Sequence, residues 1–139
     1  MTVQDPGEAF CWLLTDFVST TEGAVHAVAV SADGIALATS DSMTTASADK
    51  FSAITAGLSS LVHGAADCFG ETTVERVLIE MGSSFLMIAS VSHGCVLGVI
   101  CTKTADLGQV AYEMTLFAQR AGSVLSPTII SELQNSLVV

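Results

Sequence analysis

The stretch SADKFSAITAGLSSLVHGAADCF, residues 47–69, carries a helical pattern with two distinct faces. Bulky apolar residues recur at the i, i+3, i+4, i+7 spacing that is typical of an amphipathic helix. These residues are Phe51, Ile54, Leu58, Leu61, Val62, Ala65 and Phe69. We expect this face of the helix to cover a hydrophobic core.

The other face of the same helix carries a row of small residues, Ala53, Gly57, Ser60 and Gly64. Each interior glycine costs a helix roughly 1 kcal/mol relative to alanine. Two such losses on one row indicate that another backbone approaches closely there, so we interpret the row as a contact surface for self-association. Two alternatives stay open: a surface that has drifted toward small residues, and packing of the row inside the monomer.

The composition favours a single domain that buries part of its surface in a partner. With 139 residues, 50% of them hydrophobic, the chain fits one compact domain over residues 1–139. We expect its core to span about residues 8–127 and the last residues, 128–139, to form a loosely docked tail. Only 13% of the residues are charged, against about 25% in an average soluble domain.

The charge balance excludes one class of partner and disfavours another. The formal net charge is −10, and only four residues are basic. Nucleic-acid binding needs a basic footprint, so we exclude it. The acidity also disfavours anionic lipid surfaces, and no apolar run approaches the 18 or so residues that span a bilayer. Because the first residues lack the features of a signal peptide, we expect a cytoplasmic protein without direct membrane insertion.

Local signals in the first half of the chain predict a helix and a hairpin. Asp5-Pro6-Gly7-Glu8 combines a capping residue, a proline at the first helical position and a glutamate three residues after the cap. Gly23 marks the end of that helix. Asp33-Gly34 supplies the turn of a hairpin between strands at residues 24–30 and 35–40.

The second half predicts three more strands and a last helix. Runs at residues 73–80, 85–91 and 95–101 are strand-like and form an antiparallel meander, while the long helix before them ends at Gly70. Asp106 begins the last helix, which Gly122 and Pro127 should end. Continuous apolar runs in the strands indicate that helices cover both faces of the sheet. The sequence therefore predicts an α+β fold in three layers, with one long helix on one face of a five-stranded antiparallel sheet and two helices on the other.

We find no motif for catalysis, for a cofactor or for a metal ion. The chain lacks GxxxxGK[ST], GxGxxG and GxSxG. Its four cysteines and three histidines show no metal-ligand spacing, and we expect the cysteines to be reduced and buried. An arginine can stabilise phosphoryl transfer in a partner GTPase, but we do not expect this role for Arg76 or Arg120. The simpler interpretation is that Arg76 pairs with nearby acids and that Arg120 is solvated near the end of a helix.

Three stretches together resemble the roadblock family, the small domains related to dynein light chains and to bacterial regulators of Ras-like GTPases. They are VAVSADG at residues 28–34, ITAGLSSL at residues 54–61 and ADLGQVAYEM at residues 105–114. Their order and spacing match the predicted elements. The sequence is most similar to actinobacterial members that accompany small GTPases.

The resemblance implies a profilin-like fold and a homodimer in which the long helices lie side by side and the third strands pair. The expected dimer contacts are Ala53, Gly57, Ser60, Gly64, Val74, Arg76 and Leu78. Pairing would also protect the edge of the sheet. In the family the dimer face with both long helices meets the GTPase, so Lys50, His63 and Asp67 are the expected contacts for that partner.

The leading hypothesis is therefore a non-enzymatic, homodimeric regulator or scaffold that binds a Ras-like small GTPase and modulates its nucleotide cycle. It requires no cofactor. One alternative is a small-molecule sensing module, which predicts an apolar pocket with convergent polar groups. Another is a structural subunit that forms larger oligomers without a GTPase.

Overall fold

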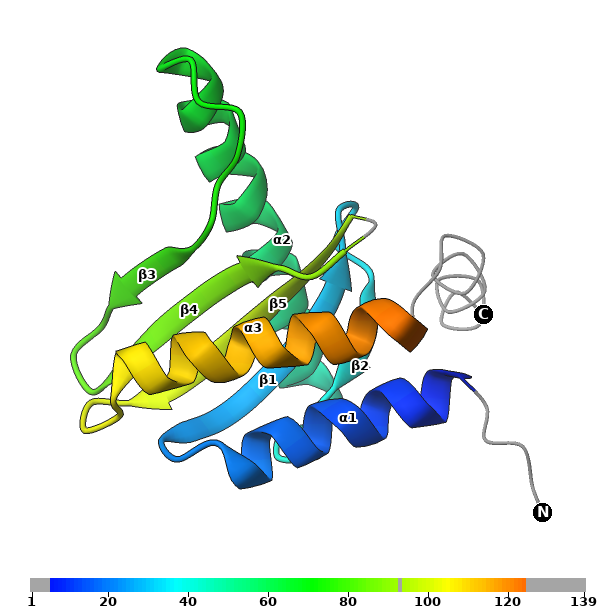
Figure 1. Ribbon diagram of the computed structural model, residues 1–139. Helices are drawn as coiled ribbons and strands as arrows, with labels where there is room; N and C mark the ends of the chain where they lie inside the picture. The colour runs from blue at the N-terminus through cyan, green and yellow to red at the C-terminus, as the bar shows by residue number, and fades with distance from the viewer. Residues whose placement is uncertain (1–5, 93, 125–139) are drawn as a thin grey trace.

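The computed structural model describes residues 6–92 and 94–124 of the chain. Helices and strands follow the predicted order (Figure 1). They are α1 (Pro6–Thr20), β1 (Ala24–Ser31), β2 (Ala36–Thr39), α2 (Thr45–Cys68), β3 (Val77–Glu80), β4 (Ser84–Ser90), β5 (Cys95–Thr102) and α3 (Leu107–Val124). The predicted cap Asp5, Pro127 and the predicted tail at residues 128–139 lie outside the described residues.

The five strands form one antiparallel sheet in the order β2-β1-β5-β4-β3. The last three strands are the predicted meander, and β5 pairs with β1 to join the meander to the first hairpin. In Figure 1, α1 and α3 lie side by side on one face of the sheet and α2 crosses the other face. The predicted three-layer α+β fold is confirmed.

Caps and turns account for most of the element boundaries. Gly34 has a φ of +90° in the first hairpin, a conformation that other residues rarely adopt. Asp106 caps α3, since its Oδ1 accepts a hydrogen bond from the backbone N–H of Gln109 at 3.1 Å. Gly70, with a φ of +73°, follows the end of α2 as predicted.

Gly122 does not end α3, because the helix continues to Val124, whereas Pro127, the other residue expected to end it, lies outside the described residues. The neighbouring Ala121 is fully buried in the core, and this packing holds the last turn of the helix despite the glycine. The core on this face lies between the sheet and the helices α1 and α3. Phe10 and Phe17 of α1 pack against Phe117 of α3, with ring centroids 6.0 and 5.6 Å apart.

The predicted core face of α2 is largely wrong. The residues of α2 that are buried on the sheet are small: Ala48, Ser52, Thr55, Ala56 and Ser59. They allow a close approach at Gly98 of β5, where an added Cβ would lie only 2.6 Å from the Thr55 Oγ1. A bulky residue on either side would push the helix away from the sheet, so small residues form this contact.

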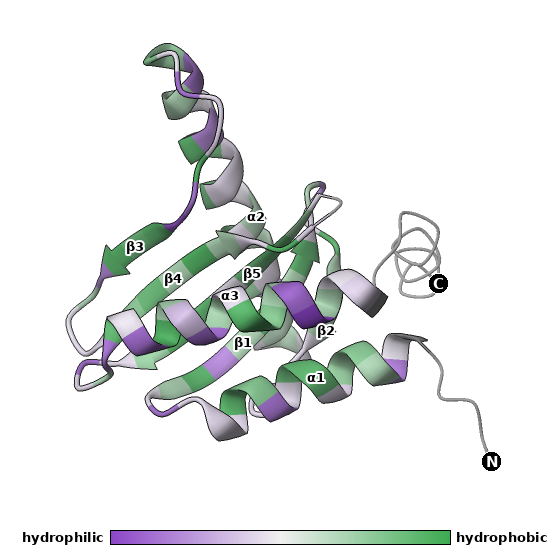
Figure 2. Cartoon of the chain, viewed as in Figure 1, coloured by the Kyte–Doolittle hydropathy of each residue, from purple (hydrophilic) through white to green (hydrophobic). Residues whose placement is uncertain are grey.

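The apolar ridge, which we define as Phe51, Ile54, Leu58, Leu61, Val62, Ala65 and Phe69, lies beside that contact. Phe51 and Leu58 pack in part against the sheet, whereas Ile54, Leu61 and Phe69 are exposed by 53, 73 and 83%. The second half of α2 projects beyond the sheet (Figure 1), and no residue of α2 after Ser59 is buried. Figure 2 shows hydrophobic residues on this projecting part.

The third strand is shorter than predicted. It begins at Val77 rather than at residue 73, because the chain returns from the projecting end of α2 and reaches β4 only where Val77 pairs with Ile88. Val74 and Arg76 therefore precede the strand, and Leu78 lies in it.

The cysteine prediction holds for half of the residues. Cys95 and Cys101 are buried, but Cys11 and Cys68 are exposed. Cys68 is the last residue of α2, and Cys11 lies on α1 beside the edge strand β2.

Candidate functional site

The small-residue row of α2, defined as Ala53, Gly57, Ser60 and Gly64, is exposed along its whole length. A Cβ added at Gly57 or at Gly64 would meet no atom within 4 Å. Packing of these glycines inside the monomer, one of the alternatives for the row, is therefore wrong. The role of the row as a contact between two copies stays a prediction.

Two of the predicted contacts at the sheet edge, Leu78 and Arg76, lie toward the face of the sheet that carries α3. Leu78 is half exposed on the face of the sheet that carries α3. The Arg76 Nη2 donates a long hydrogen bond of 3.5 Å to the Thr115 Oγ1 of α3. Its predicted pairing with acids is therefore wrong. In the described part of the chain the one ion pair joins Lys103 to Glu80, at 2.5 Å.

The three predicted GTPase contacts are all exposed on α2, but they do not converge in one chain. His63 and Asp67 lie one turn apart on the same side of the helix. Lys50 lies 17 residues before Asp67, roughly 25 Å away at about 1.5 Å per residue. A single partner could touch all three only over a long surface.

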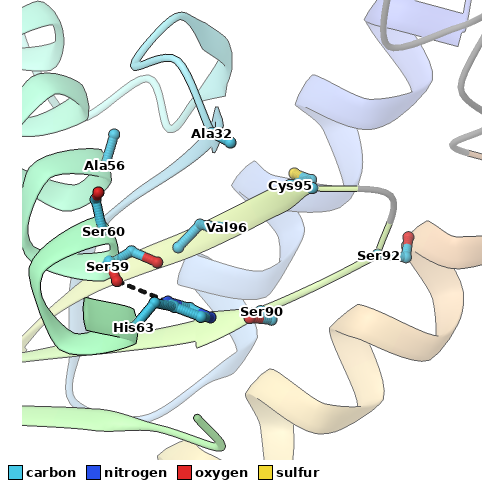
Figure 3. Close-up of a pocket in the computed structure, with 10 residues that line it drawn as sticks. Ala32, Ala56, Ser59, Ser60, His63, Ser90, Ser92, Cys95 and Val96 are labelled. Carbon is cyan, nitrogen blue, oxygen red and sulfur yellow. Dashed lines mark hydrogen bonds between the residues drawn. The ribbon is translucent and has the colours of Figure 1, made fainter. Parts of the chain in front are cut away.

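A cavity of about 430 Å³ lies between α2 and the two turns at one end of the sheet. It is lined by Ala32, Ala56, Ser59, Ser60, His63, Ser90, Ser92, Gly94, Cys95 and Val96. Figure 3 shows Ser59 and His63 extending from α2 toward β4 and β5, with Ser90 beside the imidazole. No sequence motif pointed to this cavity, because its polar residues come from segments about 30 residues apart that only the fold brings together.

The hydrogen bonds of the cavity define which groups are free. The His63 Nδ1 donates to the carbonyl oxygen of Ser59 at 2.6 Å, so a neutral ring presents its Nε2 as an acceptor. Burial raises the pKa of the Cys95 thiol to about 12, and the group is therefore a poor nucleophile at neutral pH. Within residues 6–92 and 94–124, no three metal-ligating side chains gather at one point, and no helix is long and apolar enough to cross a membrane.

A family model described as the Roadblock/LC7 domain matches residues 10–101, more than half of the chain. The chain belongs to the Roadblock/LC7 domain family. Among curated proteins, no relative matches this roadblock domain.

Solved structures agree with the family. A Roadblock/LC7 domain from Streptomyces avermitilis is 28% identical, with a TM-score of 0.78 over 81% of this chain and 94% of that one. MglB from Myxococcus xanthus, at 18% identity and a TM-score of 0.74, covers 96% of both chains and shares the fold. Profilin II from Acanthamoeba castellanii, at 16% identity and a TM-score of 0.52 over 81% of this chain and 99% of that one, shows the profilin-like architecture.

Proposed function

We propose that this roadblock domain is a non-enzymatic, homodimeric regulator or scaffold in the cytoplasm, which binds a Ras-like small GTPase and modulates its nucleotide cycle. Family membership supports the regulatory role. The observation that carries the proposal is the uncovered apolar ridge on the projecting half of α2. Large apolar side chains exposed side by side mark interaction sites on soluble proteins.

The spacing of the apolar ridge suits an antiparallel pair of α2 helices. Its most exposed residues inside the helix, Ile54 and Leu61, are seven apart, and Phe69 follows eight residues later. When Leu61 lies near the two-fold axis, Ile54 faces Phe69 of the partner subunit. In the same register Leu58 faces the small side chain of Ala65 of the partner subunit. A symmetric contact of this kind uses the same patch on both copies.

The edge strand β3 would continue the contact. No strand covers the outer side of β3 in the described chain, and unpaired edge groups favour pairing with another strand. Pairing of two β3 strands would place Leu78 at the junction, with Val74 and Arg76 beside it. MglB has been solved in a tetrameric arrangement, which is compatible with self-association in this fold.

We propose that the GTPase binds across the paired α2 helices, with Lys50, His63 and Asp67 as contacts. In an antiparallel pair, Lys50 of one copy approaches the end of the helix that carries Asp67 of the partner subunit, so the two copies would bring these positions together. Binding biases the nucleotide cycle only as far as the GDP and GTP states differ in affinity.

Sedimentation of matched variants tests the dimer. We expect the wild-type chain to sediment as a dimer and Leu61→Asp to sediment as a monomer, because a carboxylate would be buried against its symmetry mate. Gly57→Leu tests the small-residue row, and Tyr112→Ser, on exposed α3, is the control. A monomeric wild type at high concentration refutes the dimer. If Gly57→Leu dissociates the dimer and Leu61→Asp does not, the two copies contact each other through the small-residue row and not through the apolar ridge.

Nucleotide-dependent binding tests the regulatory role. Any Ras-like small GTPase encoded near this chain should be loaded with GDP or with a GTP analogue and captured on the immobilised dimer. We expect one state to be retained more strongly, and Lys50→Glu with Asp67→Lys to weaken retention without dissociating the dimer. Equal retention of both states, or none, removes the regulatory role.

A further inference from the structure

We propose that the outer edge of β3 selects a second copy of this chain through its charges and in one register. In this register Leu78 faces its own copy, and Arg76 of each copy pairs with Glu80 of the partner subunit. The inference rests on the homodimer of the proposed function. It adds what the edge recognises, which is a strand that carries a base and an acid in matching places.

Three side chains of the β3 edge lie on the face of the sheet that carries α3. The Arg76 guanidinium lies against α3, and the Glu80 carboxylate pairs with Lys103 of the β5–α3 turn. Leu78, between Arg76 and Glu80 in the strand alternation, is 52% exposed. The edge therefore presents a base, an apolar side chain and an acid in a row.

The backbone of the same row is open to a second strand. β3 is an outer strand of the sheet, and no other strand of the described chain covers its free side (Figure 1). The Met81 N–H donates to the Ser84 carbonyl of β4 at 2.9 Å. Because the bonding side alternates along a strand, Leu78 and Glu80 turn their N–H and C=O groups away from β4. Such groups favour pairing with another strand.

Side-chain alternation limits how two β3 strands can pair. Directly opposite residues of an antiparallel pair lie on the same face of the sheet, so one residue of β3 must face its own copy. If Glu80 does so, two carboxylates oppose each other. If Val77 does so, Arg76 faces Leu78 of the partner subunit. If Ile79 does so, Glu80 faces Leu78 of the partner subunit.

The remaining register matches every pair. With Leu78 opposite its own copy, Arg76 faces Glu80 of the partner subunit. On the α2 face, the partly buried Val77 packs against Ile79 of the partner subunit. Opposite charges directly across two strands stabilise the pair, whereas like charges destabilise it. The charges therefore favour this register over the other three.

The local charge also suits the pairing of two acidic chains. Each chain has a formal net charge of −10, so two copies repel each other at long range. Two of its four basic residues, Arg76 and Lys103, lie at this edge. Lys103 binds the Oε2 of Glu80, and Arg76 of the partner subunit would bind the Oε1. The carboxylate then lies between two bases.

Disulfide trapping identifies the register. The exposed cysteines are first replaced by Cys11→Ser and Cys68→Ser. Leu78→Cys should then form a covalent dimer under mild oxidation, since bonded pairs have Cα atoms about 5.5 Å apart, within disulfide range. Val77→Cys and Ile79→Cys should cross-link only with each other, in a mixture. Self-cross-linking of either one, or none by Leu78→Cys, overturns the register.

Charge reversal tests the ion pairs. Arg76→Glu sets acid against acid and Glu80→Arg sets base against base, so at low salt each should dimerise about tenfold more weakly than the wild type, or worse. In an equimolar mixture every pair joins an acid to a base, so the two variants should bind each other about tenfold more tightly than either binds itself. Native mass spectrometry resolves the three dimers by mass. Arg120→Glu and Glu22→Arg, both at exposed positions, change the net charge equally and should neither lose affinity nor gain on mixing.

The outcomes separate the register from the dimer itself. A monomeric wild type removes the dimer of the proposed function, and the register with it. If the wild type is dimeric while the two charge variants dimerise normally, or gain nothing when mixed, the dimer stands and the register is overturned. Preferential pairing of the mixed variants, together with self-cross-linking of Leu78→Cys, is the result that we expect.

Discussion

Gly98→Ala tests the close contact between α2 and the sheet. The new Cβ would lie 2.6 Å from the Thr55 Oγ1, 2.9 Å from its Cγ2 and 3.3 Å from its Cβ. Both residues belong to packed elements, and overfilling such a contact costs about 1–3 kcal/mol. Replacing glycine returns about 0.5–1 kcal/mol, since the unfolded chain loses freedom. We expect the free energy of unfolding to fall by about 1–2 kcal/mol.

A second substitution, Thr55→Ala, tests whether contact with Thr55 causes the loss of stability in Gly98→Ala. Thr55→Ala removes the two atoms nearest to the new Cβ and leaves only the contact at 3.3 Å. Alone it should be almost neutral, because it removes a buried methyl group worth about 1 kcal/mol and also a buried hydroxyl without a partner, which costs a similar amount. In the double variant, Thr55→Ala should recover about 1 kcal/mol of the loss caused by Gly98→Ala, a coupling expected of residues in contact.

Urea unfolding followed by far-UV circular dichroism measures these differences. All variants should be compared at one protein concentration, because self-association adds to the apparent stability. Gly82→Ala is the control, since an added Cβ there meets nothing within 4 Å. The reasoning is refuted if Gly98→Ala is as stable as this control, or if the two substitutions are simply additive.

Three further outcomes are expected. Gly23→Ala should lower the free energy of unfolding by at least about 2 kcal/mol in the same assay, because Gly23 has a φ of +92° and its Cβ would lie too close to Ala105; an unchanged midpoint contradicts this. Thr55→Val should raise stability by about 1 kcal/mol, since it removes an unpaired buried hydroxyl; a loss would mean that the hydroxyl has a partner. Burial raises the pKa of Cys95 to about 12, so at pH 8 the thiolate is scarce, and mass spectrometry should find iodoacetamide on exposed Cys68 but on Cys95 only in urea; native labelling of Cys95 would show that the site opens.

Local chemistry made most of the fold predictable from the sequence. The turn at Asp33-Gly34 and the cap at Asp106 act within a few residues of themselves, so their effect needs no knowledge of the tertiary structure. The side of α2 that packs on the sheet was predicted wrongly. The spacing of large apolar residues indicates that they are covered, but it does not indicate whether the sheet or another chain covers them. Gly98, 43 residues after Thr55, decides which side of the helix meets the sheet.

The candidate sites could likewise be predicted only where their residues lie within one element. The small-residue row was identified from its spacing, since the residues share one helix. The cavity was not, because Ser59 and Ser90 become neighbours only when α2 crosses the sheet. Serines are common and carry no recognisable pattern at that separation.

The folding of the projecting half of α2 should depend on the concentration of the protein. In an isolated chain the turns after Ser59 are held mainly by their own backbone hydrogen bonds, and so short a helical segment is marginal in water. Amide protons there should exchange with deuterium rapidly at nanomolar concentration and slowly at high concentration, while those of residues 48–59 stay protected throughout. In the proposed dimer, the second half of α2 in a newly made chain would become stably helical only when that chain binds a second copy. The rate of synthesis would therefore set the fraction of chains that are fully folded and able to bind a partner.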